Sequence, residues 1–289
     1  MLASEISVTQ LVSEIHHPAL RILYTTSNHA AASKPQSVIQ QPSAFIPGSQ
    51  LFDFKDVIVD KHSDLTNTMP CKEVFEQEVR RLGINVDTDI VVYDDIGNFC
   101  ASRVWFMFKS MGHDSIKVLS GGLGEWLSTG ASTQDGLSNA TALGNFKAHP
   151  NPHYQFVDKD FIAGQIACVD KPQLPLFDAR SAPRFSGAVP EQDPRLRSGH
   201  IFNSGNIHYQ RLQEKNGAYL PIQQIKEIFQ DATPDDMKHA AMAFTCGSGV
   251  TACILAQAAD AVGYSPLYVY DGSWSEWGKC EELPMSTGE

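Results

Sequence analysis

Basic residues, long apolar runs and paired cysteines are all scarce in this sequence, and each shortage excludes a class of protein. The 289 residues include 22 Lys and Arg against 33 Asp and Glu, which gives a formal net charge of −11. Nucleic acids and anionic membranes attract basic surfaces, so we expect neither as a partner. No apolar run approaches the roughly 20 residues that cross a bilayer. The N-terminus contains Glu5 and Glu14 and lacks the basic start and apolar core of a signal peptide.

The six cysteines are widely spaced, at positions 71, 100, 168, 246, 253 and 280, and none forms a Cys-x-x-Cys pair. Thioredoxin-like redox chemistry and zinc ribbons both need such pairs, so we expect neither. We also expect no bound metal and no cofactor. Free thiols survive in a reducing compartment, which predicts a cytoplasmic protein.

The length and composition favour a globular protein with two domains. Hydrophobic residues make up 42% of the chain and charged residues 19%, a balance that disordered chains do not have. A chain of this length is long for a single core. Residues 128–153 are rich in Ser, Thr, Gly, Asn and Pro and lack apolar periodicity, as linkers do. We therefore predict an N-terminal domain over 1–130, a linker over 131–153 and a C-terminal domain over 154–289.

The two halves of the chain repeat one pattern, which consists of a strand, a loop, a helix, a second strand and the motif Gly-x-x-x-Glu-Trp. Its parts lie at 89–94, 102–112, 116–120 and 121–126 in the first half, and at 240–245, 251–263, 266–271 and 272–277 in the second. Alternating strands and helices are typical of parallel sheets with helices on both faces. The repeat predicts an α/β fold in which each domain has one such sheet.

The segment Thr245–Thr251, with the sequence TCGSGVT, carries the strongest chemical signal. Cys246 follows a buried strand, and two glycines separate it from a helix. Ligands of α/β sheets bind at this position. Gly247 and Gly249 allow successive backbone N–H groups to turn inward as an anion-binding nest, and the helix adds the positive end of its dipole. Both effects favour a thiolate at Cys246, which we predict to be the nucleophile.

Two other interpretations of Cys246 are weaker. A buried cysteine is often only a small apolar side chain, and this interpretation stands for the other five cysteines. Cysteine phosphatases use a loop of the pattern Cys-x5-Arg, in which the arginine holds phosphate oxygens. The corresponding position here is Ala252, which excludes that chemistry.

Several motifs resemble those of tandem-domain sulfurtransferases of the rhodanese family, and specifically the 3-mercaptopyruvate sulfurtransferases. The resemblance to the second, catalytic domain rests on CGSGVTA, YDGSWSEWG, FDARSAPRF and LRSGHI, at 246–252, 270–278, 177–185 and 196–201. Residues 93–108 and 121–126 resemble the inactive first domain. There the repeat places Asp94 where the second half has Cys246, and a carboxylate cannot carry sulfur.

The resemblance implies a mechanism with two half-reactions. The Cys246 thiolate takes sulfur from 3-mercaptopyruvate, pyruvate leaves, and a thiol, a thioredoxin-like protein or cyanide removes the sulfur from the persulfide. Gly247, Ser248, Gly249, Val250 and Thr251 would surround the sulfur with backbone amides. Arg184, in SAPRF, matches the arginine that holds the substrate carboxylate in the family.

The sequence departs from the family pattern in three places. Many relatives have a second substrate arginine where this chain has Asp193, which leaves Arg195 and Arg197 as candidates for that role. Several relatives also pair the loop serine with an Asp and a His from the first domain. The matching stretches here are 52–55 (FDFK) and 67–70 (NTMP). Neither stretch has the partner residue at the position where those relatives have it. We therefore expect Ser248 to act as a hydrogen-bond donor and not as part of a proton relay.

Two further functions remain open. One is a thiosulfate sulfurtransferase, although thiosulfate-preferring relatives place basic side chains where this chain has Gly247 and Ser248. The other is a non-catalytic rhodanese-like module that binds a partner or carries sulfur. The intact Gly-x-Gly loop after Cys246 favours an enzyme over such a module.

Overall fold

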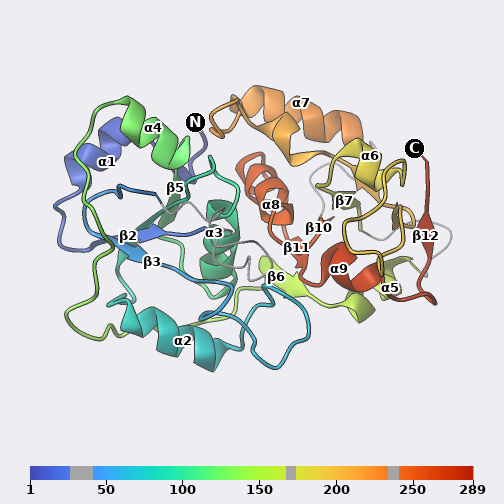
Figure 1. The fold of residues 1–289 in the computed structure, drawn as a ribbon, viewed down its shortest axis with the longest axis horizontal. Coiled ribbons are helices and arrows are strands. Elements are labelled where there is room, and N and C mark those ends of the chain that lie inside the picture. The colour runs from blue at the N-terminus through green and yellow to red at the C-terminus, as the bar shows by residue number, and fades with distance from the viewer. Residues whose placement is uncertain (27–41, 167–173, 234–240, 289) are drawn as a thin grey trace. The chain divides into compact units, whose positions relative to one another are not determined.

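The structure is a computed structural model that describes residues 1–26, 42–166, 174–233 and 241–288 (Figure 1). The chain forms two compact units. The first consists of Met1–His62, Met69–Asn151 and Glu214–Tyr219, and the second of Ser63–Thr68, Pro152–Gln213 and Leu220–Glu289. Each unit thus receives a short segment from the part of the chain that mostly builds the other.

The first unit has a five-stranded parallel sheet with the strand order β1-β5-β4-β2-β3. Its elements are β1 (Glu5–Ile6), α1 (Val8–Glu14), β2 (Leu20–Tyr24), β3 (Ser49–Leu51), α2 (Lys72–Arg81), β4 (Asp89–Tyr93), α3 (Ala101–Ser110), β5 (Ile116–Leu119) and α4 (Gly122–Ser128). Successive side chains of a strand point to opposite faces of the sheet. Val91 and Tyr93 pack in one core with Leu11 of α1 and Trp126 of α4, while Val92 is buried on the opposite face. The sheet is therefore covered on both faces, as its continuous apolar strands require.

The second unit repeats this arrangement, with a parallel sheet of order β6-β11-β10-β7-β9. Its elements are β6 (Tyr154–Val157), α5 (Lys159–Ile166), β7 (Leu176–Asp178), α6 (Ala182–Phe185), β8 (His200–Ile201), β9 (Gly205–Asn206), the 3₁₀ helix η3 (Tyr209–Leu212), α7 (Ile222–Ala232), β10 (Met242–Thr245), α8 (Ala252–Ala261), β11 (Leu267–Tyr270), α9 (Ser273–Trp277) and β12 (Met285–Ser286). Strands β8 and β12 form a separate antiparallel pair. Ala243 packs with Trp277 of α9, and the neighbouring Phe244 packs against Phe229 of α7. Helices thus cover both faces here too, and the predicted α/β repeat is confirmed.

The segment predicted as a linker, 131–153, does not run free between the units. Residues up to Asn151 belong to the first unit. Phe146 and Ala148 are buried, and the Phe146 ring lies 5.8 Å from Phe75 of α2 and 6.0 Å from Phe108 of α3. These isolated apolar residues have no periodicity, which is why the sequence pattern did not show that they are packed.

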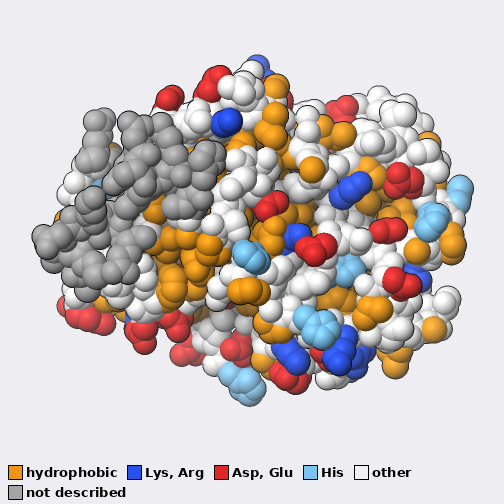
Figure 2. Space-filling model, turned by 180° about the vertical axis from the view of Figure 1, so that it is seen from behind, with side chains coloured by type: hydrophobic (Ala, Val, Ile, Leu, Met, Phe, Trp, Pro, Cys, Tyr) orange, Lys and Arg blue, Asp and Glu red, His pale blue; other side chains and the backbone are white. Residues whose placement is uncertain are grey.

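Two surface properties bear on the expected partners. Among the described residues, no helix combines the length and the apolar composition needed to cross a membrane. On the face that Figure 2 shows, acidic and basic side chains of the described residues are interspersed.

Candidate active site

Cys246 directly follows β10 and begins the loop that leads into α8. Figure 1 labels both of these elements. Its side chain is buried, with 2% of the residue exposed. The hydroxyl of Ser273 accepts a hydrogen bond from the Cys246 amide at 3.2 Å and donates one to the Tyr270 carbonyl at 2.7 Å. The Cys246 carbonyl accepts a bond from the Trp274 amide at 3.0 Å. The start of α9 therefore holds the backbone of Cys246 on both sides of its Cα atom.

Four of the backbone amides in the loop after Cys246 have no hydrogen-bond acceptor within the described residues. Within the described part of the chain, nothing accepts a hydrogen bond from the backbone N–H of Gly247, Ser248, Val250 or Thr251. Gly249 has φ +74°, a left-handed conformation that glycine adopts without steric cost. Backbone N–H groups at the N-terminus of a helix form a ready site for an anion. The loop can thus stabilise negative charge on the Cys246 sulfur without a basic side chain.

The first unit contains the same loop with a carboxylate in place of the thiol. The Leu123 amide donates to the Asp94 carbonyl at 2.9 Å, which matches the bond from Trp274 to Cys246. Asp94 is the residue after β4, as Cys246 is the residue after β10. The structure therefore confirms the predicted correspondence of Asp94 and Cys246.

The Asp94 carboxylate shows what this loop binds. It accepts hydrogen bonds from the amides of Ile96 at 3.0 Å, Cys100 at 2.6 Å and Ala101 at 3.0 Å. Burial raises the pKa of Asp94, and these three N–H groups act in the opposite direction by favouring the charged form. In the first unit the anion nest is thus filled by a side chain of the loop itself. In the second unit the corresponding residue is a buried cysteine, at the start of a loop whose amides have no such carboxylate to bind.

Arg184, in the short helix α6, lies beside the Cys246 loop. A Cβ atom built on Gly247 would be 3.5 Å from Nη2 and 3.8 Å from Nη1 of Arg184. The other edge of the guanidinium is occupied by Glu191, with Nη2 to Oε2 at 2.6 Å and Nε to Oε1 at 3.3 Å. The edge formed by Nη1 and Nη2 therefore faces the loop, where it can hold a carboxylate with two parallel hydrogen bonds.

A buried ionic network fixes the orientation of Arg184. Glu191 has only 3% of its side chain exposed and also pairs with Arg180, at 2.8 Å. Arg180 in turn pairs with Asp178 at the end of β7 and lies over the Trp274 ring at 4.5 Å. The network thus connects Arg184 to Trp274, whose backbone amide donates to the Cys246 carbonyl.

The two candidates for a second substrate arginine occupy different environments. Arg195 is exposed and makes a bidentate pair with Asp193, at 2.9 and 2.7 Å, which lowers the pKa of Asp193 to about 2. Arg197 is half-buried, and its guanidinium donates to the carbonyls of Trp277, Gly278, Cys280 and Leu283. Nothing in this geometry brings either guanidinium to Cys246. The arrangement of Arg197 favours a structural role at the end of α9.

Comparison with known proteins gives a consistent result. The rhodanese-like domain model matches twice, at residues 41–129 and 166–280. The chain is 31% identical to thiosulfate/3-mercaptopyruvate sulfurtransferase 2 of Arabidopsis thaliana, over 97% of its own length and 85% of the relative's. It is 34% identical to the thiosulfate sulfurtransferase of Rattus norvegicus, over 90% and 85% of the two chains. The crystal structure of SseA, a 3-mercaptopyruvate sulfotransferase from Escherichia coli, superposes with a TM-score of 0.79 at 27% identity, covering 94% and 99%.

The chain belongs to the rhodanese family. Within that family it is a tandem-domain sulfurtransferase, as its motifs predicted. Relatives of similar identity are named for mercaptopyruvate, for thiosulfate or for both, so identity alone does not select the sulfur donor.

The other described cysteines lack the surroundings of Cys246. Cys100 and Cys253 are fully buried, and the Cys253 thiol donates to the Gly249 carbonyl at 3.4 Å. Cys71 is exposed at the start of α2 and Cys280 is half-buried after α9. Cys168 lies outside the described residues. In this sulfurtransferase, Cys253 thus contacts the backbone of the loop that follows Cys246.

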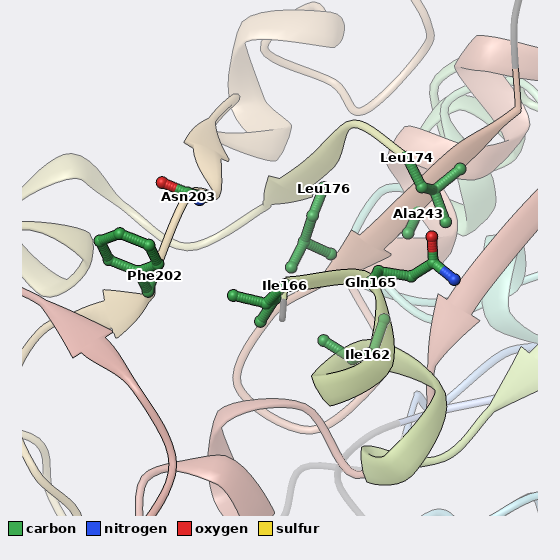
Figure 3. Close-up of a pocket in the computed structure, with 8 residues that line it drawn as sticks. All are labelled: Ile162, Gln165, Ile166, Leu174, Leu176, Phe202, Asn203 and Ala243. Atoms are coloured by element: carbon green, nitrogen blue, oxygen red, sulfur yellow. The ribbon is translucent and has the colours of Figure 1, made fainter. Parts of the chain in front are cut away.

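Cavities elsewhere in the second unit offer no rival centre. The one in Figure 3 has a volume of about 10 Å³, enough for a single water molecule, and is lined mainly by apolar side chains of α5, β7 and β10. A hollow of about 500 Å³ borders α6 near Ser204–Asn206. No charged side chain among the described residues lines either cavity, so neither is suited to an anionic substrate.

Three residues at the site were not singled out from the sequence. Ser273 supports Cys246, Glu191 orients Arg184, and Asn67 contacts the loop residue Ser248 at 3.2 Å. Repeat alignment could have found Ser273, because it occupies the position of Gly122, and both residues have positive φ, +49° and +59°. No local pattern indicates the other two contacts.

Proposed function

We propose that this sulfurtransferase uses 3-mercaptopyruvate as its sulfur donor and Cys246 as the residue that carries the sulfur. The second unit is then the catalytic one, and the first, with Asp94 in its nest, is inert. The observation that carries the proposal is the combination at one loop of a buried thiol, four amides that have no acceptor among the described residues, and a guanidinium edge facing that loop. The amides suit a thiolate or persulfide, and the guanidinium suits a carboxylate.

The proposed first half-reaction balances without a cofactor. The Cys246 thiolate attacks the sulfur of mercaptopyruvate, so a sulfur–sulfur bond forms as the bond between that sulfur and C3 breaks. The electron pair of the broken bond moves to C3, where the adjacent carbonyl stabilises it as an enolate. The enolate takes up the proton that was on the substrate thiol and leaves as pyruvate. A persulfide anion remains on Cys246, and the loop amides hold it.

The second half-reaction returns the enzyme to its thiolate. A thiol, a thioredoxin-like protein or cyanide attacks the outer sulfur, the sulfur–sulfur bond breaks, and the electron pair returns to Cys246. The nest is complementary to an anion on this residue in both states, so it serves both half-reactions.

The charge around the loop favours mercaptopyruvate over thiosulfate. Thiosulfate is a compact dianion, and its desolvation must be offset by cations at the loop. Gly247 and Ser248 add no charge. One of the two hydrogen-bonding edges of the Arg184 guanidinium is already paired with Glu191. One guanidinium edge matches the single carboxylate of mercaptopyruvate.

Thiosulfate is the second candidate donor. It is favoured by the thiosulfate sulfurtransferase of Rattus norvegicus, which is 34% identical over most of the chain. It is also favoured by the position of Arg184, which places one cation beside the loop. A role as a non-catalytic sulfur carrier would use the same nest without release of pyruvate.

The experiment compares kcat/KM for the two donors at neutral pH, with cyanide as the acceptor. We expect a clear preference for mercaptopyruvate, measured by the release of pyruvate against the formation of thiocyanate from thiosulfate. Equal or better use of thiosulfate would contradict the donor assignment. Failure to turn over either donor would favour a non-catalytic module.

A further inference from the structure

Asn67 reaches the catalytic loop from a distant part of the chain. It belongs to the segment Ser63–Thr68, which packs with the second unit although the residues on either side belong to the first. The Asn67 side-chain amide donates to the Ser248 carbonyl at 3.2 Å and to the Ser248 hydroxyl at 3.4 Å. Asn67 is 5% exposed and Ser248 is half-buried, so these contacts are partly shielded from solvent.

The segment around Asn67 is held by its own hydrogen bonds. The Ser63 hydroxyl accepts bonds from the Leu65 amide at 3.1 Å and from the Thr68 hydroxyl at 2.9 Å. Asn67 has φ +66°, a left-handed conformation that asparagine tolerates better than most residues. The backbone thus presents the Asn67 side chain to the loop in one orientation.

The chemistry of an amide group determines what this contact does. The Nδ2 atom of Asn67 can only donate, so the Ser248 hydroxyl accepts from it and keeps its own hydrogen for a further acceptor. The bond to the Ser248 carbonyl fixes the following peptide plane. In a trans peptide the N–H points opposite to the C=O, so the Gly249 amide is turned away from Asn67. The hydrogen of the Ser248 hydroxyl and the N–H of Gly249 therefore both point away from Asn67.

We infer that Asn67 is a positioning residue for sulfur transfer, which acts by orienting the Ser248 hydroxyl and the adjoining loop amides toward the sulfur on Cys246. The inference rests on the sulfur transfer proposed above. An asparagine at this place keeps the contact to Ser248 but does not gain or lose a proton, so it orients the donor without relaying a proton.

Two substitutions remove the donor and tolerate the left-handed backbone. Asn67→Gly deletes the amide, and Asn67→Asp replaces it with an oxygen of nearly the same shape. Single-turnover formation of the Cys246 persulfide from mercaptopyruvate should slow about three- to tenfold in Asn67→Gly, as expected for a lost neutral hydrogen bond. Asn67→Asp should slow it further, because its carboxylate repels the Ser248 carbonyl oxygen and accepts the Ser248 hydroxyl hydrogen, which is then turned away from the sulfur. The KM for mercaptopyruvate should change little, since Asn67 is not expected to touch the carboxylate.

Asn203 provides the matched control. It has φ +60°, lies in the second unit, is exposed, and makes no contact with the loop. Asn203→Gly and Asn203→Asp should leave the rate of persulfide formation unchanged. If the Asn67 and Asn203 variants all keep the wild-type rate, the inference is overturned.

A double-mutant comparison separates positioning from a general loss of stability. Part of the effect of Asn67→Gly should disappear in a Ser248→Ala background, because the hydroxyl that Asn67 orients is then absent. Full additivity of the two rate effects would contradict the proposed role of the hydroxyl. If the wild-type protein forms no persulfide with either donor, the proposed function fails, and this inference fails with it.

Discussion

Arg184 offers the most quantitative test of substrate recognition. Its guanidinium is held by Glu191 on one edge and faces the Cys246 loop with the other. A charge-assisted bidentate contact to a carboxylate contributes about 1.5–3 kcal/mol. Because 41% of the Arg184 side chain is exposed, solvent screening places the expected loss near 1.5–2 kcal/mol. Arg184→Ala should therefore lower kcat/KM for mercaptopyruvate roughly 10- to 30-fold.

The fold should survive this substitution, because Glu191 keeps its pair with Arg180 at 2.8 Å. Arg184→Lys should recover only part of the activity, since an ammonium group cannot form two parallel hydrogen bonds. Arg195→Ala is the matched control, because Arg195 also makes a bidentate pair with a carboxylate but lies in solvent. The assay is the initial rate of pyruvate release at several donor concentrations, with thermal unfolding as a check. A change below about threefold in Arg184→Ala would refute the role of Arg184, whereas an equal loss in Arg195→Ala would identify Arg195 as the second substrate arginine.

Two further predictions concern the loop. Ser273→Ala removes the acceptor of the buried Cys246 amide. The free energy of unfolding in urea should therefore fall by about 1–3 kcal/mol, and persulfide formation should become slower. Unchanged stability and rate would mean that the hydroxyl does not support the loop. Gly247→Arg combined with Ser248→Lys should shift the kcat/KM ratio toward thiosulfate, because added cations compensate the desolvation of a dianion. A Cβ atom at position 247 would be in ordinary contact with the Arg184 guanidinium, at 3.5 Å, so a side chain can begin there without a clash. An unchanged ratio would contradict the electrostatic argument.

The parts of the structure that the sequence predicts are those encoded by local patterns. The apolar strands at 89–94 and 240–245 and the repeated Gly-x-x-x-Glu-Trp motif indicated two related parallel sheets, and the strand orders of the two units confirm this. The position of Cys246 between a strand and a helix followed from the same pattern. The Asp94 correspondence also followed, because each of the two residues comes directly after the matching strand of the repeat.

The parts that escaped prediction depend on contacts between distant residues. Asn67 and Ser248 are 181 positions apart, and nothing in the segment 63–68 shows that it packs with the second unit. Phe146 lies in a polar stretch without periodicity, yet it joins an aromatic cluster with α2 and α3. The sequence left Arg195 and Arg197 open as candidates for a second substrate arginine, and it did not indicate that Arg197 donates to carbonyls about 80 positions away, near α9.

The central claim is that Cys246 carries the sulfur, and locating that sulfur tests it most directly. The protein is incubated with mercaptopyruvate, digested without reductant and analysed by mass spectrometry, before and after treatment with cyanide. We expect one additional sulfur atom on the peptide that contains Cys246, its removal by cyanide, and no addition in a folded Cys246→Ser variant. Sulfur on Cys253 or Cys100 instead, or wild-type turnover by Cys246→Ser, would contradict the account.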